Sequence, residues 1–196
     1  MKKEIERQQR EEAILCSLKK LNYLNRSQLQ RLHDLGSDRN AQRVLQQLSP
    51  YVSSFKDGEN IYYLNKEGRE RVNSKRVLKK TTQSRHYIMR NELYIQSGCP
   101  QSWKNEMKLE VPNKVKLIAD AYFIRKKQYH LIEVDHLQKM IKNKSKIERY
   151  MQLFSYNVFD IPPKLIWITT TELRRKQLIK LCEGLDVKVF TIQDFI

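Results

Sequence analysis

The sequence has few cysteines, and they form no recognisable pair. The three, Cys16, Cys99 and Cys182, are far apart and include no Cys-x-x-Cys spacing. A disulfide framework needs an even number of cysteines, and a structural zinc site needs closely spaced thiolates or imidazoles. The sequence therefore excludes a disulfide-rich secreted scaffold and a cysteine-based zinc domain. We expect free thiols in a reducing cytoplasm.

Long apolar runs and nucleotide-binding loops are missing as well. No stretch approaches the roughly 18 apolar residues of a membrane span, and the start Met1-Lys2-Lys3-Glu4 has no apolar signal core. The sequence contains no Gly-rich phosphate loop, no Gly-x-Ser-x-Gly and no histidine pair of the HUH type. We therefore expect a cytoplasmic protein with no membrane partner. A helicase, a serine hydrolase and a relaxase are disfavoured.

Positive charge is what the chain has in excess. It carries 38 Lys and Arg against 22 Asp and Glu, for a net charge of +16. Such a balance attracts polyanions, nucleic acid above all. The basic, polar stretch 73–83 separates two regions with globular composition. The sequence predicts two domains, over residues 1–78 and 84–196.

The first region opens with three predicted helices. Apolar spacing favours helices over 5–21 and 38–48, with a short helix from Ser27 to about residue 33 between them. Ser27 and Ser37 are the residue type that caps a helix N-terminus. Gly36 supplies the tight turn before the third helix.

A hairpin follows these helices. Residues 52–55 and 61–64 alternate between apolar and polar around Asp57-Gly58, a strong hairpin signal. A fourth helix is expected to begin near Asn65. A helix, a helix–turn–helix and a β-hairpin in this order are the layout of a winged helix.

The third predicted helix suits DNA recognition. Its apolar side would face the core, and Arg39, Asn40, Arg43 and Gln46 lie on its other side. Arg and Asn on a helix in the major groove make bidentate bonds to guanine and adenine edges. Lys56 on the hairpin would contact a phosphate. The alternative is an ordinary solvated helix face, and winged helices also bind proteins.

The second region alternates strands and helices. It is expected to contain helices over 84–97, 138–156 and 172–183 and strands over 103–111, 115–124, 129–134, 165–170 and 187–191. With the first region, this order predicts an α+β protein. The order α-β-β-β-α-β-α-β resembles the core of the PD-(D/E)XK nuclease-like fold with one strand appended.

Acidic residues lie at the ends of two apolar strands here. Carboxylates near buried strands are costly unless they are paired or bind a cation. Asp120 on one strand and Glu133-x-Asp135 on the next resemble the metal-binding hairpin of that fold, which implies Mg²⁺ on Asp120 and Glu133. The pattern requires lysine where Asp135 stands, and Lys146 on the following helix would replace it. The alternative is that Asp120 and Asp135 cap turns or form structural ion pairs with Arg125 and the lysines of the following helix.

Several short motifs together resemble one family. They are His86 with Asn91, Trp103 and Glu106, Ala119-Asp120-Ala121, Glu133-Val134-Asp135, and Lys146 with Tyr150. The chain is similar to the replication-relaxation proteins of bacterial plasmids and integrative elements. This resemblance implies a DNA-binding accessory of replication or mobilisation that works with a relaxase or a replication initiator. A Mg²⁺-dependent endonuclease and a transcriptional repressor are the alternatives, and a homodimer is left open.

Overall fold

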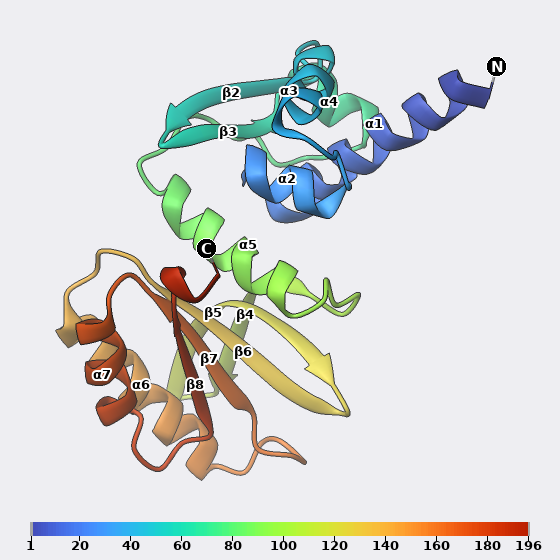
Figure 1. The fold of residues 1–196 in the computed structure, drawn as a ribbon. Coiled ribbons are helices and arrows are strands. Elements are labelled where there is room, and N and C mark those ends of the chain that lie inside the picture. The colour runs from blue at the N-terminus through green and yellow to red at the C-terminus, as the bar shows by residue number, and fades with distance from the viewer. Residues whose placement is uncertain (1, 196) are drawn as a thin grey trace. The chain divides into compact units, whose positions relative to one another are not determined.

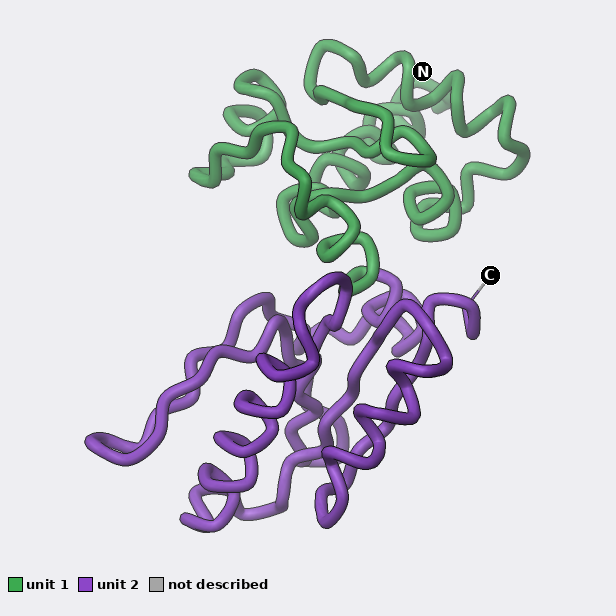
Figure 2. Tube along the Cα trace, turned by 90° about the vertical axis from the view of Figure 1, so that its left-hand side faces the viewer, with its two compact units in different colours: residues 1–91 green, residues 92–196 purple. Residues whose placement is uncertain are grey.

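The computed structural model describes residues 2–195, which form two compact units divided between residues 91 and 92 (Figure 2). Each unit combines helices with a sheet of its own (Figure 1). The predicted α+β class is therefore confirmed. The division at Asn91 and Glu92 lies inside one helix, α5 (Ser84–Gln96).

The first unit packs four helices and the start of α5 around a three-stranded sheet. The helices are α1 (Lys2–Leu21), α2 (Arg26–Leu32), α3 (Asp38–Gln47) and α4 (Lys66–Arg71), and the strands are β1 (Leu24–Asn25), β2 (Val52–Asp57) and β3 (Glu59–Leu64). The sheet is antiparallel with the order β1-β3-β2. Its hydrophobic core includes Ile14, Leu15 and Leu18 of α1 and Leu45 of α3.

The helix starts follow from capping side chains. Ser37 Oγ accepts a hydrogen bond from the Asn40 backbone N–H at 3.3 Å, and Asn65 Oδ1 accepts from that of Gly68 at 2.9 Å. These two predicted starts are confirmed. The predicted cap at Ser27 is wrong, because Asn25 caps α2 by accepting from the Gln28 N–H at 2.9 Å.

Ser27 instead lies within α2 and donates from its N–H and hydroxyl to the Glu59 carboxylate at 3.0 and 3.1 Å. This links α2 to β3. The adjoining strand β1 has no counterpart in the sequence-based prediction, because two residues give no alternation pattern.

Close packing fixes the one glycine of α4. A Cβ on Gly68 would lie 2.0 Å from the Tyr51 carbonyl oxygen. No real side chain tolerates that distance, so α4 approaches the start of the hairpin through glycine. Arg71 of α4 lies over the Tyr51 ring, with its guanidinium carbon 4.5 Å from the ring centre.

The predicted bridge, residues 73–83, contains no helix or strand, yet the compact division comes later in the chain. The first half of α5 is tied to the first unit by hydrogen bonds. Asn91 Nδ2 donates to the carbonyls of Leu21 and Tyr23 at 3.1 and 2.6 Å, and Gln28 Nε2 donates to that of Ile88 at 2.8 Å. Residues 84–91 therefore belong with the first unit.

The second unit is built on a five-stranded sheet with the order β4-β5-β6-β7-β8. The strands are β4 (Lys104–Val111), β5 (Val115–Arg125), β6 (Gln128–Asp135), β7 (Lys164–Thr169) and β8 (Val187–Thr191), with helices α6 (Met140–Ser155), α7 (Glu172–Leu181) and the 3-10 turn η1 (Ile192–Phe195). The first three strands are antiparallel, and β6, β7 and β8 are parallel. The predicted element order is confirmed.

Helices α6 and α7 cover one face of this sheet (Figure 1). Tyr150 and Leu178 pack there against Leu117, Leu131 and Trp167. A buried side chain of this size contributes roughly 1.5–3 kcal/mol relative to an exposed one. An aromatic row crosses this sheet, where Phe123 of β5 stacks on Trp103, just before β4, and on His130 of β6, with ring centres 6.0 and 4.5 Å apart.

Candidate functional site

The surface of α3 is strongly two-sided. Arg39, Arg43 and Gln46 are exposed, whereas Val44 and Leu45 on the other side are buried. The spacing of four and three residues places the three exposed side chains on one face of the helix. The helix thus presents two guanidinium groups and an amide to the solvent.

Asn40 differs from the other predicted DNA-contacting residues of α3 in that its side chain bonds to the turn before the helix. It is half-buried, and its Nδ2 donates to the Leu35 carbonyl at 2.7 Å, which secures the turn before α3. Its Oδ1 accepts from Arg43 Nη2 at 2.8 Å. Asn40 therefore orients Arg43 and the turn instead of extending into the solvent.

The hairpin carries the remaining predicted contact. Lys56 is exposed on β2, opposite Asn60 of β3. The neighbouring Asp57 accepts from Ser84 Oγ at 2.8 Å and from Arg85 Nε at 3.0 Å, so the hairpin tip is anchored to the start of α5. The sequence predicts Asp57 as a turn residue and gives no sign of this anchor.

Asp120 lies where the regular pairing of β5 with β6 stops. The ladder runs from Arg125 to Ala121, and the Val134 N–H donates to Asp120 Oδ2 at 2.8 Å. Ala119 and Tyr122 both contact the core under α6, although strict alternation would place them on opposite faces. A local irregularity therefore lies at Asp120, where the pairing with β4 skips one residue on each strand without a shift in register.

Glu133 is buried beneath α6. Only 1% of it is exposed, and its two oxygens accept separately from Lys146 Nζ and from the Tyr150 hydroxyl, the latter at 2.5 Å. Lys146 and Tyr150 are four residues apart, so both lie on the same side of α6. Burial raises the pKa of Glu133 to about 8, and the Asp120 charge acts in the same direction against Lys146 and Tyr150.

Asp135, at the position where the fold pattern has lysine, is part of another network. It is fully buried and accepts from Arg174 Nε and Nη2 at 2.7 and 2.6 Å and from Thr169 Oγ1 at 2.7 Å. Burial alone would raise its pKa, but the hydrogen bonds from Arg174, Asn143 and Thr169 lower it below the ordinary value. This bidentate pair joins β6 to α7, whereas the structural alternative expects Arg125 or the helix lysines as partners.

The carboxylates of the second unit do not form a cluster of metal ligands among the described residues. Within residues 2–195, no three or more His, Cys, Asp or Glu side chains converge as a metal site requires. Mg²⁺ favours six oxygens in an octahedron, whereas the Glu133 oxygens are engaged by Lys146 and Tyr150. In this arrangement the residues do not fit a resident Mg²⁺, and the predicted ion stays a prediction.

A basic groove of about 720 Å³ lies beside Lys146. We call it the β5–α6 groove; its lining residues are Lys116, Leu117, Ile118, Gln138, Ile141, Lys142, Ser145, Lys146 and Arg149. Lysines 142 and 146 are visible in the sequence as part of a basic helix. The sequence does not indicate that these lysines line one groove with the start of β5, because that depends on how α6 packs on the sheet.

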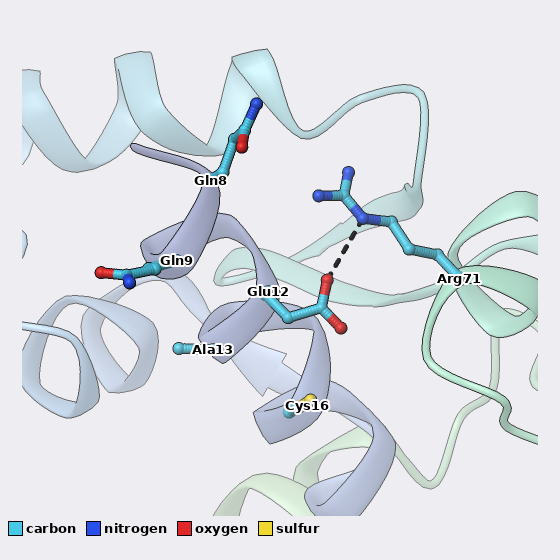
Figure 3. A pocket seen from close by; sticks show the side chains of 6 residues that line it. All are labelled: Gln8, Gln9, Glu12, Ala13, Cys16 and Arg71. Carbon is cyan, nitrogen blue, oxygen red and sulfur yellow. Dashed lines mark hydrogen bonds and ion pairs between the residues drawn. The ribbon is translucent and has the colours of Figure 1, made fainter. Parts of the chain in front are cut away.

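A second hollow, of about 490 Å³, lies on α1 and is lined by Gln8, Gln9, Glu12, Ala13, Cys16 and Arg71 (Figure 3). Glu12 and Arg71 form an ion pair across it at 3.3 Å, which links α1 to α4.

None of the helices within residues 2–195 combines the length and apolarity needed to cross a bilayer.

Comparison with known families assigns the chain. The model of the replication-relaxation family matches residues 15–162, a segment that contains every predicted site residue. The chain belongs to the replication-relaxation family. This membership supports a role in the replication or mobilisation of a plasmid or another mobile element.

Other comparisons add little to the family assignment. The solved structure of protein VC1899 from Vibrio cholerae matches with a TM-score of 0.41 and 14% identity. The match covers 93% of this replication-relaxation chain and 48% of that chain, so this chain spans about half the length of VC1899. No curated protein gave a significant match.

Proposed function

We propose that this replication-relaxation protein is a DNA-binding accessory of plasmid or mobile-element replication or mobilisation. Its first unit acts as a winged helix that recognises a DNA site. The observation that carries this proposal is the exposed face of α3, where Arg39, Arg43 and Gln46 lie opposite a buried apolar side. The order of α2, α3 and the β2–β3 hairpin supports it.

This face has the chemistry that base recognition needs. An α-helix fits the major groove, and Arg bonds two acceptors of guanine at once. Arg43 is oriented by Asn40, which lowers the entropy lost on binding. Lys56 on the hairpin adds a phosphate contact, and the +16 net charge adds attraction that does not depend on sequence.

The second unit is proposed to hold DNA or a relaxase or initiator on a PD-(D/E)XK-like scaffold. Support comes from the α-β-β-β-α-β order and from the placement of Asp120 and Glu133 on neighbouring strands. The pairing of Glu133 with Lys146, and of Asp135 with Arg174, favours binding over metal-dependent hydrolysis.

Alanine substitutions on α3 test the DNA-binding proposal. Arg39→Ala and Arg43→Ala are each expected to cost roughly 1–3 kcal/mol of binding free energy at the cognate site and little on random duplex. Fluorescence anisotropy with labelled origin DNA measures both. Lys3→Ala removes an exposed charge at the start of α1 and serves as the matched control. Equal losses on cognate and random DNA would contradict base recognition.

A Mg²⁺-dependent endonuclease is the second candidate. It is favoured by the hydrogen bond from the Val134 N–H to Asp120, which places Asp120 beside the strand that carries Glu133. Its test is incubation of supercoiled and single-stranded origin DNA with Mg²⁺ or Mn²⁺. Cleavage that disappears in both Asp120→Asn and Glu133→Gln would establish the nuclease. Intact DNA with retained binding would leave the accessory function.

A further inference from the structure

The β5–α6 groove is positively charged in a way that the family assignment does not explain. Four of its nine lining residues are basic and none is acidic. Lys146 is engaged by the buried Glu133. Lys142 is exposed and has no ion-pair partner within residues 2–195. Arg149 lies across the groove, where its Nη1 donates to the Lys116 carbonyl at 3.5 Å.

The same groove also exposes aliphatic side chains. Ile118 is 52% exposed and Ile141 is 65% exposed, and both line it. A single exposed apolar residue is ordinary. Two isoleucines among cations, in one concave surface, offer apolar area together with charge, which is the composition of a protein-binding site.

The combination of cations and isoleucines distinguishes between two negatively charged ligands, single-stranded nucleic acid and an acidic peptide. Single-stranded nucleic acid binds through bases that stack on aromatic rings, with cations along the backbone. None of the nine lining residues is aromatic. A sugar–phosphate backbone would also leave the isoleucines without apolar contacts, whereas an acidic peptide with leucine, isoleucine or valine side chains covers them and supplies carboxylates.

We infer that the β5–α6 groove binds an acidic, amphipathic segment of a partner protein. Carboxylates of that segment pair with Lys142, Lys116 and Arg149, and its aliphatic side chains pack on Ile118 and Ile141. The inference rests on the proposed function for the existence of a partner, and it names the chemistry by which that partner is recognised. The α3 surface takes no part in it.

A synthetic helical peptide with glutamate and leucine repeated along one face is the probe. Anisotropy of the labelled peptide with the full chain should show saturable binding that weakens when serine replaces leucine or lysine replaces glutamate. Ile141→Ser is expected to weaken binding about five-fold through lost apolar contact. Lys142→Glu should weaken it about ten-fold through charge reversal.

Two substitutions on α7 are the matched controls. Leu173→Ser and Lys176→Glu change exposed residues that do not line the groove, and peptide affinity should stay unchanged. Absent peptide binding, or an unchanged affinity in Ile141→Ser, would overturn the inference. Labelled oligothymidine that binds and is lost in Lys142→Glu but not in Ile141→Ser would assign the groove to nucleic acid and overturn it equally.

The two proposals fail separately. Arg43→Ala should weaken duplex DNA binding without altering peptide affinity, and Ile141→Ser should do the reverse. An unmodified chain that binds the peptide but does not distinguish origin DNA from random DNA would contradict only the proposed function. Intact DNA binding with no peptide binding would contradict only the inference about the groove.

Discussion

The Tyr150 hydroxyl donates a 2.5 Å hydrogen bond to Glu133 Oε1, and both residues are at most 1% exposed. This contact joins α6 to the centre of the sheet. Lys146, one turn earlier on α6, engages the other oxygen of the same carboxylate. The acidic residue that most resembles a metal ligand is thus satisfied by its own chain.

Removal of the Tyr150 hydroxyl tests this arrangement. Tyr150→Phe leaves a buried carboxylate oxygen without its donor, which should lower the free energy of unfolding by about 1–3 kcal/mol. Urea unfolding followed by circular dichroism measures the change. Tyr156→Phe, a half-exposed position at the end of the same helix, is the control and should change stability little. Equal effects of the two substitutions would show that the buried bond contributes nothing specific.

The Asp135–Arg174 pair should be costly to break. Arg174→Ala leaves a fully buried carboxylate without its bidentate partner, and the expected loss is about 3–5 kcal/mol. Lys176→Ala on the exposed side of α7 is the comparison. If Asp135→Asn combined with Arg174→Ala is no more stable than Arg174→Ala alone, the uncompensated charge is not the cause.

Glu133 predicts a pH dependence of stability. Its pKa in the folded chain is about 8, above the ordinary value of 4.5. The stability gained from its protonated form is complete below 4.5 and is lost as the pH rises through 8. Glu133→Gln cannot ionise and should remove this decline, as urea unfolding at about pH 5 and about pH 9 would show. An equally steep decline in the variant would place the titrating group elsewhere.

Asn40 and Arg43 should affect DNA binding differently. Because Asn40 supports the turn before α3 and orients Arg43, Asn40→Ala should lower both stability and DNA affinity. Arg43→Ala should lower affinity at the cognate site while stability changes by less than about 0.5 kcal/mol, because its side chain is exposed. Thermal melts beside anisotropy separate the two effects. A change in affinity for Asn40→Ala without a loss of stability would identify Asn40 as a direct base contact.

Local patterns in the sequence predicted most elements but few of the long-range contacts. The spacing of apolar residues located the helices and strands within a few residues, and Ser37 and Asn65 marked two helix starts. The pairing of Asp135 with Arg174 joins positions 39 residues apart, and no local pattern specifies it. Ser27 was misplaced because Asn25 can also cap a helix, and the choice depends on the bond from Ser27 to Glu59 of β3.

The candidate site was likewise predictable from the sequence only in part. The resemblance to a metal-binding hairpin predicted Asp120 and Glu133 at opposing points of paired strands, and adjacent antiparallel strands do bring such residues together. It gave no sign that Tyr150 donates to Glu133 or that Arg174 reaches Asp135, since those contacts depend on how α6 and α7 pack on the sheet. The exposed face of α3 follows from helical periodicity alone, whereas the inward bond of Asn40 depends on the Leu35 turn.

Site selection by the first unit is the central claim, and one comparison tests it most directly. The affinity of the full chain for a duplex from the origin of its own element is measured against a scrambled duplex of equal length and composition at physiological salt. A DNA site recognised through α3 predicts a preference of at least about 1,000-fold for the origin sequence. Equal affinities, both falling steeply with salt, would contradict the account and leave a basic protein that binds DNA without reading it.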